Sequence, residues 1–291
     1  MNKVICYLSL FKFRLSLTVA FSASVGFLLP DCDFSILNFC FLLIGGVFLT
    51  FSANGFNQVL ERKEDSIMNR TRARPLPVNS LNLKEAVVSS GLIFFISIFL
   101  LFKINFLSFV FGFLAFFIYV FIYTPLKKKT PISIIFGAIS GSLPFMLGWV
   151  ARTGDFDIEP GFLFAIQFLW QFPHFFAIVS LYMNDYKKAG FKMIFLNNGY
   201  NINYILSCIF SFLLIPLFIL SFLKMTGEIQ VSFIFLLFLI FLSVFYFYLS
   251  CLFYLNRNSH NNHIFAKKLK YFSYLFLPLV QIILILDKFI F

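Results

Sequence analysis

The chain has 291 residues, of which 60% are hydrophobic and 12% are charged, and its formal net charge is +11. Ordinary soluble domains carry about 25% charged residues, and several uncharged runs here approach the length of about 20 residues that crosses a bilayer as a helix. The composition therefore excludes a soluble domain and predicts a helical membrane protein. The positive charge lies in the loops between apolar runs, so it indicates membrane orientation and not nucleic-acid binding.

Hydropathy predicts nine spans joined by short loops. No polar stretch is long enough for a separate domain, so residues 1–291 are expected to form a single integral-membrane domain. Charges precede the first span and no small-residue cleavage site follows it, which favours a retained span over a cleaved signal. The predicted spans are 13–30, 35–60, 86–102, 106–124, 131–150, 161–183, 203–223, 230–254 and 270–287.

The basic residues predict the orientation of these spans. If the N-terminus is cytoplasmic, all but four of the 23 Lys and Arg residues fall on the cytoplasmic side, as the positive-inside rule requires. The four exceptions are Lys103, Arg152, Lys224 and Lys288. We therefore expect a protein of the inner (cytoplasmic) cell membrane whose C-terminus lies on the opposite side.

The second span runs into a charged stretch, Asn54 to Leu76, which reads NGFNQVLERKEDSIMNRTRARPL. Asn57, Glu61 and Asp65 are spaced four residues apart, so a helix would place them near one face with about 6 Å between neighbours. A row of oxygen-bearing side chains can hold a divalent cation. The spacing therefore predicts a metal site where the span leaves the bilayer.

Three arginines, Arg70, Arg72 and Arg74, follow this row. Their planar guanidinium groups suit phosphate oxygens, so the acid row and the arginines together suggest a metal ion with a diphosphate. The alternative is a solvated loop that carries acids and bases without a ligand. The acids continue the phase of the preceding apolar helix without a turn signal, and ionisable groups at such a position are more often functional.

Two further polar segments are expected on the same face of the membrane. Tyr123 to Lys127 follows the fourth span, and Tyr182 to Gly190 follows the sixth. Asp185 could complete the metal site from an opposite wall, with Lys188 facing solvent or phosphate. Alternatively, Asp185 is an ordinary acid at a helix end.

Two ionisable side chains lie in or beside the apolar runs. His174 precedes Asp185 by eleven residues, a helical distance of about 16 Å into the bilayer. It is either a structural histidine with hydrogen bonds or a residue that orients a ligand, and the neighbouring Gln171 and Pro173 favour a polar cavity. Arg14 either anchors the first span at the lipid headgroups or contacts a ligand.

Three stretches carry a resemblance to a known family. They read NQVLERKEDSIMNRTRARPLP from Asn57, YTPLKKKTPISIIFGAISGSLPFMLGWVA from Tyr123 and WQFPHFFAIVSLYMNDYKKAGFKM from Trp170. On these motifs and on the number and order of spans, the chain resembles the protohaem IX farnesyltransferases (haem O synthases), a branch of the UbiA-type intramembrane prenyltransferases. The first motif is shared by the superfamily, whereas the WQFPHF and DYKKAG segments are specific to the haem branch.

The resemblance implies an all-α membrane protein with nine transmembrane helices around a central cavity, and Mg²⁺ as its cofactor. The site residues that it implies are Asn57, Glu61, Asp65 and Asp185 for catalysis and metal binding, Arg70, Arg74, Lys127 and Lys188 for the diphosphate, and His174, Arg14 and Tyr123 for a haem pocket. Two residues depart from the pattern: Glu61 replaces the aspartate of many members, and Ala189 stands where quinone-type relatives carry a second acid.

The implied reaction transfers a farnesyl group from farnesyl diphosphate to the vinyl side chain of protohaem IX (haem B), giving haem O for terminal oxidases. The expected partners are these two substrates, the lipid bilayer and a haem A synthase or terminal-oxidase assembly partner. A quinone-type aromatic prenyltransferase with the same diphosphate site remains an alternative. A membrane transporter or a haem carrier is another, although the charge on one face only, with none in mid-span on a through path, counts against a transporter.

Overall fold

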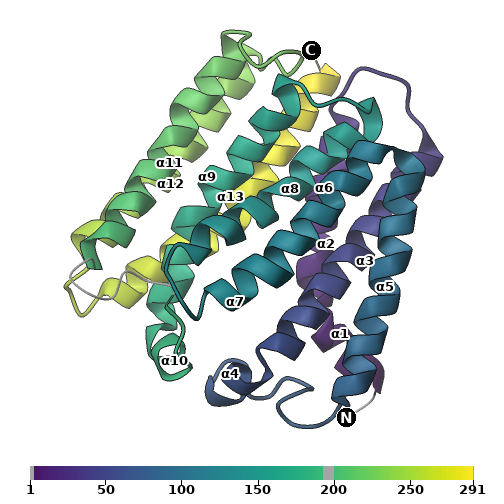
Figure 1. Ribbon diagram of the computed structural model, residues 1–291. Helices are drawn as coiled ribbons and strands as arrows, with labels where there is room; N and C mark the ends of the chain where they lie inside the picture. Colours follow the sequence, from purple (N-terminus) through teal and green to yellow (C-terminus); the bar gives the residue numbers. More distant parts are fainter. Residues whose placement is uncertain (1–2, 193–199, 291) are drawn as a thin grey trace. The chain divides into compact units, whose positions relative to one another are not determined.

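The computed structural model describes residues 3–192 and 200–290, and within these ranges the chain forms helices and no strands (Figure 1). The apolar runs form helices because a helix satisfies every backbone hydrogen bond within the segment that crosses the bilayer. The elements are α1 (Lys3–Leu10), α2 (Phe13–Leu28), α3 (Ile36–Leu60), α4 (Arg62–Ile67), α5 (Leu83–Ile104), α6 (Phe106–Phe117), the π-helix η1 (Ile118–Tyr123), α7 (Thr124–Leu126), α8 (Ser133–Thr153), α9 (Ile158–Leu181), α10 (Met183–Lys188), α11 (Tyr200–Phe222), α12 (Phe233–Leu255) and α13 (Asn262–Ile290).

Among the described residues, eight helical segments are long and apolar enough to cross a membrane. A ninth span results if α1 and α2, which are bent by 48° at their junction, are counted together. One of the eight, Phe106–Leu126, combines α6, η1 and α7. The predicted all-α class is confirmed, and the predicted nine spans are reached with the first as a broken helix. The central cavity stays a prediction.

Two predicted boundaries are wrong. Helix α1 precedes the predicted first span of 13–30, and α13 begins at Asn262 and not at residue 270. In the first turns of α13, Lys267 is exposed while Ala266 and Leu269 are buried. This stretch is an amphipathic helix, and the charged residues on one face lower its mean hydropathy, so hydropathy alone does not predict it as part of the span.

The contacts divide the chain into two compact units. Unit 1 comprises residues 1–27, 32–155 and 184–193, and unit 2 comprises residues 28–31, 156–183 and 194–291. Helices α1 to α8 and most of α10 belong to unit 1, whereas α9 and α11 to α13 belong to unit 2. The expectation of one domain stays a prediction.

In unit 1, α2 and α8 cross in close contact at two glycines. A Cβ atom added at Gly148 would lie 2.0 Å from the carbonyl oxygen of Ala23, and one added at Gly26 would lie 2.1 Å from that of Phe145. Backbone atoms cannot turn aside as a flexible side chain can, so both positions require glycine. The crossing packs the broken first span directly onto α8.

The span that begins with α6 changes its winding near its C-terminal end. Residues Ile118–Tyr123 form the π-helix η1, in which hydrogen bonds close over five residues, and the backbone N–H of Thr124 donates to the carbonyl of Tyr119. Gly137 of α8 leaves room for the Tyr123 ring, whose nearest atom lies 2.9 Å from the place of an added Cβ. Short π-helices occur frequently at functional sites.

Aromatic side chains pack the helices of unit 2. Phe172 of α9 stacks on Phe210 of α11 with ring centroids 3.8 Å apart. Tyr246 of α12 stacks on Phe276 of α13 with centroids 4.8 Å apart. Such pairs contribute about 0.5–1.5 kcal/mol beyond the area that they bury, so the many phenylalanines serve the packing of this unit.

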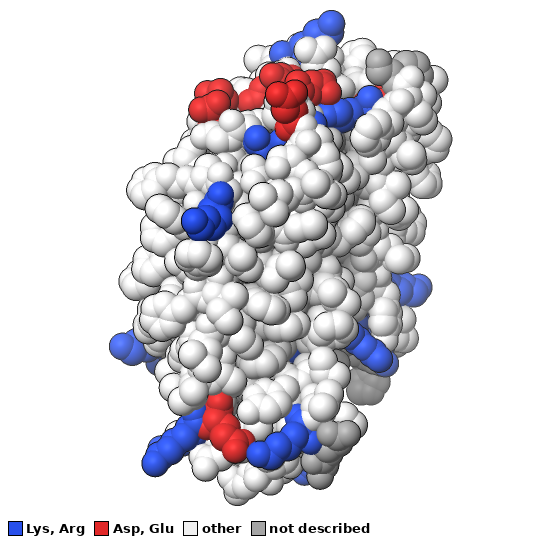
Figure 2. Space-filling view, turned by 90° about the vertical axis from the view of Figure 1, so that its right-hand side faces the viewer, with Lys and Arg blue, Asp and Glu red and all other residues white. Residues whose placement is uncertain are grey.

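Much of the surface is apolar, as in a protein embedded in lipid. On the face shown in Figure 2, most of the surface is white, and the Lys, Arg, Asp and Glu side chains occupy only small areas of it. Large apolar side chains point outward from the spans, with Phe95 71% and Phe241 69% exposed. Apolar surface of this kind needs lipid around it, and the chain is an integral membrane protein.

Candidate active site

The predicted acid row lies in unit 1, where α3 passes into α4. Asn57, Glu61 and Asp65 are all buried. The sequence predicts one uninterrupted helix, but α3 ends at Leu60 and Glu61 leaves the helical region at φ −105° and ψ 11°. The backbone N–H of Glu61 still donates to Asn57 (3.0 Å), and that of Asp65 donates to Glu61 (2.8 Å). The four-residue phase is therefore kept through the break.

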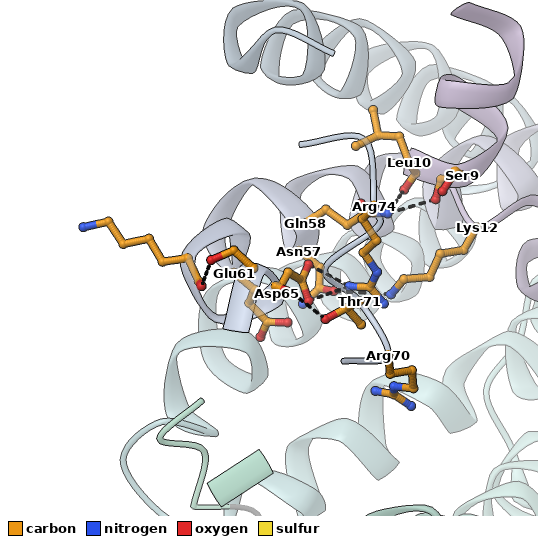
Figure 3. Close-up of polar contacts among 12 residues, drawn as sticks. Ser9, Leu10, Lys12, Asn57, Gln58, Glu61, Asp65, Arg70, Thr71 and Arg74 are labelled. Carbon is orange, nitrogen blue, oxygen red and sulfur yellow. Dashed lines mark hydrogen bonds and ion pairs between the residues drawn. The ribbon is translucent and has the colours of Figure 1, made fainter. Parts of the chain in front are cut away.

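Asp65 is paired with one of the predicted arginines. Nη1 of Arg74 lies 2.8 Å from Oδ1 and 2.7 Å from Oδ2 of Asp65, and Figure 3 shows the two side chains directed at each other. The Thr71 hydroxyl donates to the carbonyl oxygen of Asp65 at 3.0 Å. The turn after α4 thus folds back and brings Arg74 to a carboxylate nine residues earlier.

Glu61 is paired with Lys127, which follows α7. The Lys127 ammonium also lies over the ring of Tyr123, 4.8 Å from its centroid, and 5.3 Å from that of Phe191. Burial lowers the pKa of Lys127 well below its usual range, and the charges of Lys12 and Lys128 lower it further. The Glu61 carboxylate opposes this shift because it favours the ammonium.

Asp185 of α10 joins the same unit from a distant part of the sequence. It is buried, and it accepts hydrogen bonds from the backbone N–H of Arg70 (3.2 Å) and the side-chain amide of Asn69 (3.3 Å). The Arg70 guanidinium donates to the Tyr186 hydroxyl at 3.1 Å. The structure therefore brings Asp185 to the segment that carries the predicted arginines, and its predicted place in a metal site stays a prediction.

Lys12 is a site residue that the sequence analysis missed. It lies at the junction of α1 and α2 with a positive φ of 46°, and its Nζ donates to Oδ1 of Asn57 at 3.3 Å. Its only signal in the sequence is a positive charge inside an apolar segment. We call Lys12, Asn57, Glu61, Asp65, Arg74 and Lys127 the acid–base cluster.

Arg14 and Lys188 make no contact with the acid–base cluster among the contacts that the structure describes. Arg14 is exposed in the first turn of α2, and Lys188 is exposed at the end of α10. Tyr123, expected in a haem pocket, lies beside Lys127. The roles of these residues stay predictions.

His174 lies in unit 2, buried in α9. Its Nδ1 is 2.7 Å from the Ser273 hydroxyl of α13. Its ring stacks on Trp170 with centroids 5.0 Å apart and meets Tyr274 edge-on at 5.2 Å. The imidazole is thus fixed in a position set by two helices.

The oxygen atoms of the acid–base cluster are the kind that Mg²⁺ prefers. Within residues 3–192 and 200–290, no group of three or more His, Cys, Asp or Glu side chains is gathered closely enough to hold a metal ion. Glu61 and Asp65 each face a base instead. The donor set fits a magnesium ion if those two ion pairs open, and the metal-binding roles stay a prediction.

Known proteins resemble this chain in sequence and in fold. The chain is 38% identical to a protoheme IX farnesyltransferase of Christiangramia forsetii over 286 residues, which covers 96% of this chain and 92% of that protein. A solved structure concerned with digeranylgeranylglyceryl phosphate synthase aligns with a TM-score of 0.79 and 20% identity over 100% of both chains. A UbiA homologue from Archaeoglobus fulgidus bound to GPP and Mg²⁺ aligns with a TM-score of 0.66 and 17% identity over 96% of this chain and 99% of that one.

The two solved structures are similar to this chain in fold, and the sequence matches identify its family. The model of the UbiA prenyltransferase family matches residues 18–275, a range that holds the acid row, Lys127, Asp185 and His174. With this match and a relative that is 38% identical over nearly its whole length, the chain belongs to the UbiA prenyltransferase family.

Proposed function

We propose that this protein transfers the farnesyl group of farnesyl diphosphate to a vinyl side chain of protohaem IX, forming haem O. The observation that carries the proposal is the acid–base cluster, in which buried acids and buried or half-buried bases from distant segments share one unit. Oxygen ligands beside guanidinium and ammonium groups are what a metal ion with a diphosphate requires. The choice of protohaem as acceptor is supported by the name of the Christiangramia forsetii relative.

The cluster would receive a magnesium ion and the diphosphate by exchanging partners. Asn57, Glu61, Asp65 and Asp185 would hold the ion. When bound, the ion would supply positive charge that stabilises the diphosphate as its bond to farnesyl C1 breaks. Release of Arg74 from Asp65 and of Lys127 from Glu61 would leave both cations free to bind diphosphate oxygens.

The reaction balances without an oxidant or a reductant. The C1–O bond of farnesyl diphosphate breaks, diphosphate leaves, and the allylic cation is attacked by the haem vinyl group. Water then adds and a proton is released, so that a hydroxyethylfarnesyl side chain results. The chain's part is to bind the leaving group with fixed charges and to keep other water from the cation.

The hydrogen bonds of His174 support a haem-contacting role. The Ser273 hydroxyl lies 2.6 Å from the carbonyl oxygen of Lys270 and 2.7 Å from Nδ1 of His174. With Nδ1 donating to Ser273, the neutral imidazole would carry a lone pair on Nε2. A histidine nitrogen in this state can ligate haem iron, and we assign His174 this contact with the substrate.

The orientation of the protein is also a proposal. The positive-inside rule supports a cytoplasmic N-terminus and a C-terminus on the opposite side of the inner (cytoplasmic) membrane. Farnesyl diphosphate would then reach the acid–base cluster from the cytoplasm. A haem A synthase or a terminal-oxidase assembly partner would receive the product.

The acceptor can be tested with purified protein in detergent. The protein is supplied with Mg²⁺ and farnesyl diphosphate, and with either haem B or a hydroxybenzoic acid, and the products are separated and weighed by mass spectrometry. We expect a farnesylated haem and an unchanged aromatic acid. Farnesylation of the aromatic acid alone would contradict the proposal and favour a quinone-type prenyltransferase.

A further inference from the structure

The side-chain amide of Asn57 has a different partner at each end. Its Nδ2 lies 3.2 Å from the hydroxyl oxygen of Thr124, and its Oδ1 lies 3.3 Å from Nζ of Lys12. Asn57 and Thr124 are 2% and 1% exposed. An amide buried in this way cannot exchange a poor partner for water, so its orientation depends on these two contacts.

The hydroxyl proton of Thr124 is committed elsewhere. Thr124 Oγ1 donates to the carbonyl oxygen of Tyr119 at 2.8 Å, and the backbone N–H of Thr124 reaches the same oxygen. That carbonyl lies five residues earlier because the chain is wound as the π-helix η1 up to Tyr123. With its proton placed there, the hydroxyl can only accept from Asn57.

The opposite orientation of the amide is therefore excluded. If it were rotated by 180°, Oδ1 would face a hydroxyl oxygen that has no proton to give, and the NH₂ group would face Nζ of Lys12, which is itself a donor. One contact would then pair two acceptors and the other would pair two donors. The hydrogen bonds around η1 thus direct Oδ1 of Asn57 towards the cationic side of its surroundings.

We propose that Thr124 is a positioning residue that aims Oδ1 of Asn57 at the metal ion. The inference rests on the proposed function, in which Asn57 is a metal ligand. Thr124 itself touches neither the metal nor the substrates. It acts as the outer partner of a ligand, a position at which substitutions cost about 10–100-fold in metal affinity.

The test measures metal affinity directly. Mn²⁺, which paramagnetic resonance detects and which takes the same oxygen ligands, is titrated into the purified protein with an unreactive thio-analogue of farnesyl diphosphate. We expect Thr124→Val to raise the dissociation constant of Mn²⁺ about 10–100-fold. Thr124→Ser keeps the hydroxyl and should stay within about threefold of the wild type.

Two controls separate positioning from a general structural effect. Thr50→Val removes a hydroxyl that bonds only within its own helix, to the carbonyl of Gly46 at 2.9 Å, and should leave the affinity for Mn²⁺ unchanged. Asn57→Asp replaces the amide by a carboxylate that has oxygen at both ends and needs no orientation. In that background, Thr124→Val should have little effect on Mn²⁺ binding.

The outcomes are distinguishable. A wild-type affinity for Mn²⁺ in Thr124→Val, or an equal loss in Thr124→Ser, overturns the role of Thr124 while the proposed function stands. If the wild type binds no Mn²⁺ with the analogue, the metal site and this inference both fall. Thermal unfolding in detergent shows whether each variant is folded, and Thr124→Ala is titrated if the valine variant is not.

Discussion

The ion pair between Asp65 and Arg74 allows the most direct test of the acid–base cluster by substitution. The change Asp65→Asn keeps the size and shape of the side chain and removes its charge. The Thr71 hydroxyl bonds to the backbone carbonyl of residue 65, so that contact survives. The substitution therefore isolates the contribution of the carboxylate to stability and to turnover.

The expected loss of stability follows from the burial of the two side chains. Removing one partner of a buried pair costs about 3–5 kcal/mol. The Asp65 side chain is 3% exposed but that of Arg74 is 22% exposed, so water relieves part of the cost and we expect about 1.5–3 kcal/mol. Because Asp65 is also a proposed metal ligand, farnesyl transfer should fall by at least about 100-fold.

The assay combines thermal unfolding in detergent with chromatographic analysis of the haem product. The double variant Asp65→Asn/Arg74→Gln no longer holds an unpaired guanidinium, so its stability should return towards the wild type while its activity stays lost. Glu85→Gln removes the exposed pair with Lys3, at 3.4 Å, and should change neither quantity. Wild-type turnover in Asp65→Asn, or recovered turnover in the double variant, would refute the reasoning.

Three further predictions concern other parts of the molecule. Gly148→Ala should destabilise the protein by about 1–3 kcal/mol, because the added Cβ would lie 2.0 Å from a backbone oxygen. The control Gly91→Ala has nothing within 4 Å of its added Cβ and should not destabilise the protein. Equal melting temperatures of the two variants in detergent would contradict this prediction. Affinity for farnesyl diphosphate with Mg²⁺ should fall as the pH rises through the lowered pKa of Lys127, since the neutral amine no longer attracts the anion. Lys127→Arg should make the affinity less dependent on pH, because a guanidinium group stays protonated. The same dependence of affinity on pH in both proteins would count against this prediction. His174→Ala should weaken haem B binding about tenfold or more and alter the absorption spectrum of the bound haem. The control His263→Ala, at an exposed position, should change neither. A wild-type spectrum in His174→Ala would contradict the contact between His174 and the haem iron.

The spans were predictable from the sequence because they follow from local composition. Uncharged apolar runs of about 20 residues have few alternatives to a membrane helix. The amphipathic start of α13 and the short helix α1 were missed, since helices with charged faces fall below a hydropathy threshold. The bend of 48° between α1 and α2 could not be predicted, because no proline or glycine lies at that point of the sequence.

The site was predictable where its residues are close in sequence. The four-residue spacing of Asn57, Glu61 and Asp65 by itself indicates that the three side chains share one helical face. The contacts of Lys12 and Thr124 with Asn57 span 45 and 67 residues, so no local pattern reveals them. The ion pairs of Glu61 and Asp65 were also missed, because the sequence does not show which base a buried acid will meet.

The central claim is tested most directly in membranes of cells that express this chain. Their haems are extracted, separated by chromatography and weighed by mass spectrometry, for the wild type and for Asp65→Asn. We predict a new haem in the wild type, heavier than haem B by a farnesyl group and one water, and its absence in the variant. Haem B alone in membranes that contain the wild-type protein and enough farnesyl diphosphate would contradict farnesyl transfer to protohaem.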